Sequence, residues 1–132
     1  MRGIALAGTL GWALAIWQLA MRPQNPPLRL FLSLWDKLDH AAAFFVLALL
    51  LAGVLVGVAR LPALGIQLGV AVGYGIAIEV GQYLGKAGRS AEALDVVADL
   101  AGMGLALGLI ELAGWKQRGL GKARSERQRA LV

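Results

Sequence analysis

Apolar residues dominate four long stretches of the chain, and polar or proline-containing segments separate them. These stretches cover about residues 4–20, 38–59, 61–84 and 93–115. A helix needs roughly 20 predominantly apolar residues to cross the hydrocarbon core of a bilayer, and each stretch approaches or exceeds that length. The pattern therefore predicts an all-α integral membrane protein. We expect one domain at 1–115, a bundle of four transmembrane helices, followed by a tail at 116–132.

The connections between the stretches differ in kind. The second and third stretches almost touch, and Pro62 suits the first turn of a helix, where its missing N–H costs nothing, so a tight antiparallel hairpin is predicted. Prolines interrupt the chain between the first and second stretches. After them, Leu28, Phe31, Leu32 and Trp35 follow the spacing of one helix face. This spacing predicts a short amphipathic helix at the membrane interface, between the first and second transmembrane helices.

Basic residues indicate the orientation, because cytoplasmic loops of membrane proteins carry an excess of Lys and Arg. With both termini cytoplasmic, eight of the 13 basic side chains lie inside and five outside, and the tail alone carries six. We therefore expect both termini in the cytoplasm and a multi-pass protein of a bacterial cytoplasmic (inner) membrane. The basic tail predicts contact with anionic membrane lipids. It carries no motif or interleaved aromatic residues that would indicate nucleic acid as a partner.

Composition agrees with a membrane protein and excludes several other classes. The 132 residues are 58% hydrophobic and 16% charged, whereas soluble domains average about 45–50% apolar and about 25% charged. The chain has no cysteine, which excludes a small disulfide-stabilised module and a cysteine-based zinc ribbon. Its long apolar runs exclude a disordered chain and an ordinary soluble enzyme.

Acidic residues gather at one end of the predicted bundle. Six of the eight carboxylates fall at the start of the second helix, the end of the third or the start of the fourth, which an antiparallel arrangement brings to one membrane face. They are Asp36, Asp39, Glu79, Glu92, Asp95 and Asp99. Further polar residues share this face: Lys37, His40, Gln82, Arg89 and Ser90. With cytoplasmic termini, this is the outer face.

The membrane makes these positions expensive unless the side chains point inward. A charged side chain at the bilayer centre costs on the order of 2.5–3.5 kcal/mol, and such residues usually face the bundle interior. Residues three or four apart share one face of a helix. Three pairs have that spacing: Asp36 with His40, Glu79 with Gln82, and Asp95 with Asp99. We therefore predict that three polar stripes converge on one pocket.

Small residues recur at four-residue spacing in the third stretch, and Gly-xxx-Gly pairs occur in the second and fourth. The pattern comprises Gly65, Gly69, Gly73, Ala77, Gly81 and Gly85. This spacing lets helix backbones approach closely inside a membrane. It predicts close contacts within the bundle or, as an alternative, a homodimer face.

Three polar motifs occur in order between residues 30 and 110. The first is DKLDH at 36–40, followed by Phe44 and Phe45, and the second is Glu79 with Gln82. The third runs from GRS at 88–90 to Asp95, Ala98 and Gly102. Together they resemble the signature of the VanZ-like family of small bacterial membrane proteins. In that family, many members carry Asn at the position of Asp99.

The resemblance implies a cell-envelope protein with an outward-facing polar site and a link to glycopeptide (teicoplanin-type) resistance. It implies no particular reaction. The aspartate at position 99 adds a charge and lacks the two N–H donors of an asparagine amide. A role that depends on that amide therefore does not transfer to this chain.

The first functional hypothesis is a protein that binds or modulates an anionic envelope component, such as a lipid headgroup or a cell-wall precursor, without catalysis. Arg89 and Lys37 would hold the anion, because an arginine fork bonds two oxygens at once. The predicted ligand-binding residues are Asp36, Lys37, His40, Glu79, Gln82, Arg89, Ser90, Asp95 and Asp99.

The alternative is a small intramembrane enzyme that acts on a lipid-linked substrate. His40 and Glu79, or His40 and Asp36, would then form a general acid–base pair, or join Asp95 as metal ligands. One histidine is a thin ligand set, and no spacing such as HExxH occurs, so we expect no metal and no cofactor. A third hypothesis is purely structural: the polar residues only hold the helices together.

Overall fold

A computed structural model of the chain describes residues 2–22, 29–85 and 93–129, with side chains at 2–22, 35–85 and 93–114. Within these ranges every regular element is an α-helix. The helices are α1 (Arg2–Ala20), α2 (Arg29–Val54), α3 (Arg60–Leu84) and α4 (Ala93–Arg129). All four contain a segment long and apolar enough to cross a membrane. The predicted all-α bundle with four candidate transmembrane helices is confirmed.

The helix boundaries differ from the prediction at three places. Residues 29–37, expected to belong to a separate interfacial helix, form the first turns of a continuous α2, because no proline interrupts the chain there. Leu28 lies outside the described residues. α2 ends at Val54 and not near residue 59. α4 continues through most of the predicted tail, to Arg129, where again no proline stops it.

A turn at 55–58 explains the early end of α2. Gly57 has a φ of 84°, a left-handed backbone conformation that glycine adopts without steric cost. The Arg2 guanidinium donates a hydrogen bond to the carbonyl of Val56, so the beginning of α1 is fastened to this turn. The turn leads into α3 at Arg60. The prediction of a tight hairpin is met only in the short connection, because α3 packs mainly against α4 and touches α2 little.

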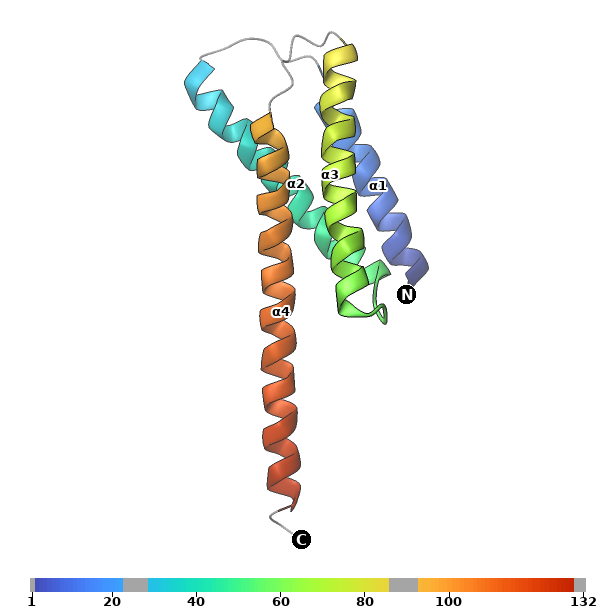
Figure 1. Ribbon diagram of the computed structural model, residues 1–132, viewed down its shortest axis with the longest axis vertical. Coiled ribbons are helices and arrows are strands. Elements are labelled where there is room, and N and C mark those ends of the chain that lie inside the picture. The colour runs from blue at the N-terminus through green and yellow to red at the C-terminus, as the bar shows by residue number, and fades with distance from the viewer. Residues whose placement is uncertain (1, 23–28, 86–92, 130–132) are drawn as a thin grey trace.

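The helices are arranged around α2, which contacts α4 most extensively and α1 next, while α3 lies mainly against α4. Figure 1 shows α2 running obliquely behind the upright α3 and α4. The start of α1, the α2–α3 turn and the long C-terminal part of α4 point to the same end of the bundle. The end of α1, the start of α2, the end of α3 and the start of α4 gather at the opposite end.

A small apolar core joins the four helices. Phe44 and Leu47 of α2 are almost fully buried, together with Ile78 of α3 and Met103 of α4. The ring of Phe44 lies 5.9 Å from that of Tyr74, a separation typical of a favourable aromatic pair. Most large apolar side chains elsewhere on the helices are exposed. That exposure fits helices whose solvent is lipid, since lipid tails are as apolar as leucine.

Polar side chains also connect the helices through backbone carbonyls. The Trp12 indole of α1 donates to the carbonyl of Ala43 in α2 at 2.9 Å. The Tyr74 hydroxyl of α3 donates to the carbonyl of Ala13 in α1. Interhelical hydrogen bonds of this kind help to hold membrane bundles together, so α1 is attached to both of its neighbours.

At Gly102 the backbones of α2 and α4 lie very close together. A Cβ added to Gly102 would collide with the backbone of Ala41, with the carbonyl carbon at 2.7 Å. Backbone atoms cannot rotate out of the way as a side chain can. Gly102 therefore allows α2 and α4 to approach more closely than any other residue at that position would permit.

We expect Gly102→Ala to lower the thermal unfolding temperature of the detergent-solubilised protein. The added methyl group forces α2 and α4 apart, and overpacking of this kind typically costs about 1–3 kcal/mol. Gly104→Ala is the matched control, because a Cβ at Gly104 meets no atom within 4 Å. The control should melt at or slightly above the wild-type temperature, since alanine favours helix over glycine by about 1 kcal/mol. Equal melting of the two variants would contradict this account.

Candidate functional site

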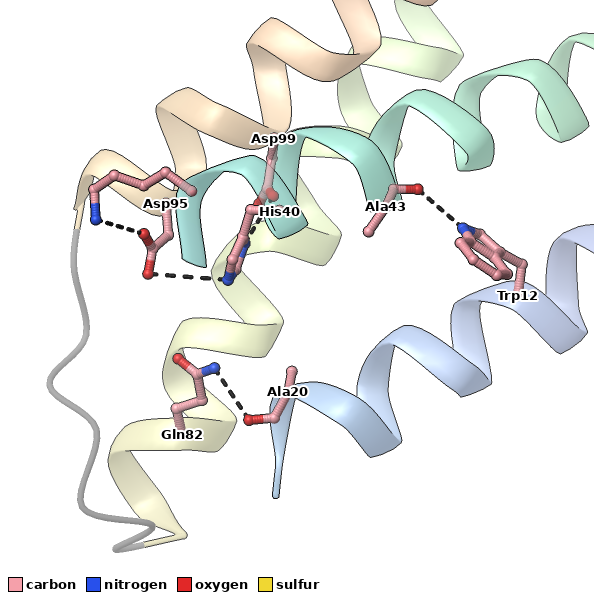
Figure 2. A network of polar contacts seen from close by, with 8 residues as sticks. Trp12, Ala20, His40, Ala43, Gln82, Asp95 and Asp99 are labelled. Atoms are coloured by element: carbon pink, nitrogen blue, oxygen red, sulfur yellow. Dashed lines mark hydrogen bonds and ion pairs between the residues drawn. The ribbon is translucent and has the colours of Figure 1, made fainter. Parts of the chain in front are cut away.

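The polar residues of α2 and α4 meet at the end of the bundle where these helices start. Lys37 of α2 and Asp95 of α4 form an ion pair, with Nζ 3.2 Å from Oδ1. The Asp95 side chain is only 3% exposed, and that of Lys37 is 20% exposed. Figure 2 shows Asp95 and Asp99 on the same side of α4, both facing α2. The four-residue spacing that predicted this stripe is responsible.

His40 lies between the two aspartates of α4 (Figure 2). Its Nδ1 is 2.9 Å from Oδ1 of Asp99, and its Nε2 is 4.0 Å from Oδ2 of Asp95. When Asp99 is ionised, its carboxylate only accepts hydrogen bonds, and Nδ1–H is then the donor to it. In the neutral imidazole, this leaves the lone pair on Nε2.

Asp99 is buried between three helices. Its exposed fraction is 1%, and one oxygen faces His40 of α2. The other oxygen faces α3 at Gly75, where an added Cβ would lie 2.7 Å from Oδ2. Glycine at position 75 thus leaves the space that the carboxylate occupies. The sequence predicts no role for Gly75, because this glycine lies outside the four-residue repeat of small residues in α3.

Lys37, His40, Asp95 and Asp99 form a polar cluster. A cavity lies next to this cluster, on the side of α1. It has a volume of about 470 Å³ and lies between α1 and α2. Along α2 its lining changes from Asp36, Asp39 and His40 to Phe44 and Val46, and α1 contributes an apolar wall. Sequence analysis did not predict this cavity, because the lining residues of α1 carry no polar signal.

Two predicted site residues on α3 are also buried. Glu79 is 8% exposed and Gln82 is 1% exposed. The Gln82 amide donates to the carbonyl of Ala20, the last residue of α1, at 3.2 Å (Figure 2). Gln82 therefore joins α3 to α1 beside the cluster.

Not every predicted residue lies in the same contact network. In the part of the chain that the structure describes, the ion-pair contacts of His40 are with Asp99 and Asp95, and a His40–Glu79 pair is not seen there. Arg89 and Ser90 lie outside the described residues. Their placement at the site stays a prediction, as does that of Glu92.

One group of residues has the donor atoms that a metal ion requires. Asp36, His40 and Asp95 each offer one ligand atom, and these atoms lie within 4.8 Å of one another. The single histidine of the sequence predicts no metal site. Only the tertiary structure shows that the ligand atoms of these three residues lie close to one another.

Comparison of the chain with protein families, with curated proteins and with solved structures gave no match.

We expect Asp99→Leu and Asp99→Asn to affect stability differently. Leucine removes the acceptor of the His40 Nδ1–H bond, and an unsatisfied buried donor typically costs about 1–3 kcal/mol. Asparagine keeps an oxygen that accepts the same bond, so its effect should be smaller. Thermal unfolding in detergent should show a clearly lower temperature for Asp99→Leu than for Asp99→Asn. Equal losses would mean that the charge of Asp99, and not its bond to His40, matters for stability.

We expect Gly75→Ala to displace the Asp99 carboxylate and so to change the environment of His40. Because His40 is the only histidine in the chain, its ring ¹⁵N and ¹H signals are assigned without ambiguity in a histidine-labelled sample. Gly73→Ala is the control, since a Cβ at Gly73 meets no atom within 4 Å. The signals should shift in Gly75→Ala and remain in place in Gly73→Ala. Unchanged signals in both variants would contradict the proposed contact.

Proposed function

We propose that this chain is a VanZ-like protein of the bacterial cytoplasmic (inner) membrane that binds an anionic, lipid-anchored component of the cell envelope. The apolar part of that component occupies the cavity between α1 and α2, and its charged group lies beside Asp36, Lys37 and His40. The cluster faces the outer side of the membrane. Through this binding the protein modulates the access of teicoplanin-type glycopeptides, a role that rests on the motif resemblance alone.

The change of polarity along the cavity carries the proposal. Asp36, Asp39 and His40 line the cavity near the start of the α2 membrane segment, whereas Phe44 and Val46 lie deeper. A bilayer lipid has the same order, with its headgroup at the surface and its chains toward the centre. The volume of about 470 Å³ is within the range of about 300–1,000 Å³ that small-molecule sites occupy.

Cations at the cluster support an anionic ligand. Lys37 follows the cavity-lining residue Asp36 in the chain, is partly exposed and forms an ion pair with Asp95 of α4. The sequence predicts that Arg89 joins it, and an arginine fork suits phosphate and carboxylate groups. Both residues belong to the motifs that resemble the VanZ-like family.

We expect native mass spectrometry of the detergent-purified protein to show a co-purified phosphate-bearing lipid or lipid-linked precursor. Ala15→Phe fills the cavity from α1, where Ala15 is part of the lining, and should reduce the bound fraction at least severalfold. Ala7→Phe is the control, because Ala7 lies on the exposed surface of the same helix. Its bound fraction should equal that of the wild type.

A second variant tests the charge of the ligand. Arg89→Ala should release an anionic ligand from a protein of unchanged melting temperature. A wild-type protein without any adduct would overturn the proposal. Equal retention in Ala15→Phe would also overturn it, because the ligand would then lie outside the cavity.

One observation favours the enzymatic alternative, a small intramembrane enzyme acting on a lipid-linked substrate. Asp99 orients His40 through Nδ1, as a carboxylate orients the general base in Ser-His-Asp hydrolases, and His40 lines the cavity. His40 would then exchange the proton, with Asp99 as the carboxylate that orients it and Glu79 or Asp36 as the acid–base partner that the sequence predicts. Turnover of the co-purified lipid that His40→Gln abolishes, with binding unchanged, would favour this alternative.

A further inference from the structure

We propose that Asp36, His40 and Asp95 form a binding site for a divalent transition-metal ion, with Zn²⁺ as the type ion. The inference extends the proposed function, since the metal would lie beside the cavity and offer a cation to the anionic group of the ligand. Metal binding itself requires no lipid, so the two proposals can fail separately.

The gap between His40 and Asp95 is the first argument. His40 Nε2 and Asp95 Oδ2 are 4.0 Å apart, which is too long for a hydrogen bond. Two ligands of one tetrahedral zinc ion, each at about 2.0–2.2 Å from the metal, lie about 3.3–3.6 Å apart. A zinc ion would bind both atoms if the two side chains moved about 0.4–0.7 Å closer together. Asp36 supplies the third donor, and all three donor atoms lie within 4.8 Å of one another.

The orientation of His40 is the second argument. Metal-binding histidines usually donate their other ring N–H to a carboxylate, which fixes the tautomer and makes the metal-binding nitrogen more basic. Asp99 has this position, with Oδ1 2.9 Å from Nδ1. The buried carboxylate thus leaves the Nε2 lone pair directed toward Asp95, where a metal would lie.

Lys37 does not block the site. Its ammonium group is 3.2 Å from Asp95 Oδ1, whereas Oδ2 of the same carboxylate is the atom that faces His40. One carboxylate can accept an ion pair on one oxygen and bind a metal through the other. Lys37 can therefore stay in place when the metal binds, as a partner of the metal-binding carboxylate.

Charge at the cluster favours a cation. Among the described residues that face His40 and Lys37 are three aspartates, Asp36, Asp95 and Asp99. Buried charges are costly unless compensated, and the low dielectric of the membrane increases that cost. A divalent cation bound there would reduce the repulsion among these carboxylates and would allow an anion to bind beside them.

The donor set indicates the class of metal. Imidazole suits zinc and other late first-row ions, whereas sites built only from oxygen favour magnesium or calcium. Three protein ligands leave one position of a tetrahedral zinc ion open. Because Asp36 and His40 both line the cavity, that open position is accessible from it.

The test uses Zn²⁺ alone as the probe, on detergent-purified full-length protein without a histidine tag. We expect one Zn²⁺ per chain by titration calorimetry. The ring signals of His40, the only histidine in the chain, should move in a histidine-labelled NMR sample with the pattern of Nε2 coordination. Co²⁺ in place of Zn²⁺ should give the visible absorption of a four-coordinate site.

A matched pair of variants separates coordination from general attraction to carboxylates. Asp36→Asn removes a ligand and should weaken Zn²⁺ affinity at least tenfold. Asp39→Asn removes the same charge three residues away, from an exposed side chain that also lines the cavity, and should leave the affinity unchanged. Asp99→Asn keeps the hydrogen-bond acceptor but weakens the support of His40, which typically reduces metal affinity about 10–100-fold.

Two results would overturn the inference. The first is that the NMR signals of the His40 ring do not change on addition of millimolar Zn²⁺. The second is that Asp39→Asn weakens Zn²⁺ binding as much as Asp36→Asn does. Ala15→Phe distinguishes this failure from a failure of the proposed function, because it fills the cavity and leaves all three metal ligands in place. Zn²⁺ bound to a protein that never carries lipid would support the metal site and refute the lipid proposal.

Discussion

The backbone contact between Ala41 of α2 and Gly102 of α4 determines the geometry of the rest of the site. His40 directly precedes Ala41, and Asp99 lies one helical turn before Gly102, so the contact brings their side chains together. The bond of 2.9 Å between His40 and Asp99 follows from this proximity. If the two helices were farther apart, the His40 ring and the Asp99 carboxylate could not reach each other, and each would lose a hydrogen-bond partner inside the membrane.

Burial in the membrane explains why the polar residues form a network. Asp95, Asp99 and Gln82 are almost fully buried in a protein whose outer surface is largely apolar. In lipid, such groups are satisfied only by other parts of the protein. Lys37 and His40 provide partners for the two aspartates, and Gln82 bonds to the end of α1. Removal of one partner of such a pair would therefore be costly, because it leaves a buried charge uncompensated and typically costs about 3–5 kcal/mol.

α1 lies opposite the polar end of α2, so that a cavity remains between the two helices with His40 of the network in its lining. α1 is joined to α2 by Trp12 and to α3 by Tyr74, and between these contacts a space of about 470 Å³ remains beside α2. The polar end of this space is acidic in its described part, since Asp36 and Asp39 line it with His40. An anionic ligand and a bound divalent cation are compatible with each other at such a site, whereas the anion alone would face two carboxylates.

The amino-acid sequence by itself determined the four helices, because runs of about 20 apolar residues have few alternatives in a membrane. It also determined which end of the bundle is polar, since an antiparallel arrangement follows from short connections. The start and end of α2 predicted from the sequence were wrong. The apolar pattern does not show that a helix extends into a preceding polar segment, and it does not show that a turn at a glycine ends the helix early.

The tertiary structure alone decided which polar residues touch. Helical spacing predicted stripes on α2, α3 and α4, but the rotation and separation of the helices depend on contacts between residues far apart in the chain. The pairing of His40 with Asp99 and Asp95, and not with Glu79, follows from the approach of α2 and α4 at Gly102. The contact of Gly75 with Asp99 and the cavity between α1 and α2 could not be predicted from the sequence either. Free space beside a carboxylate or between two helices depends on how the helices pack, and no single residue encodes it.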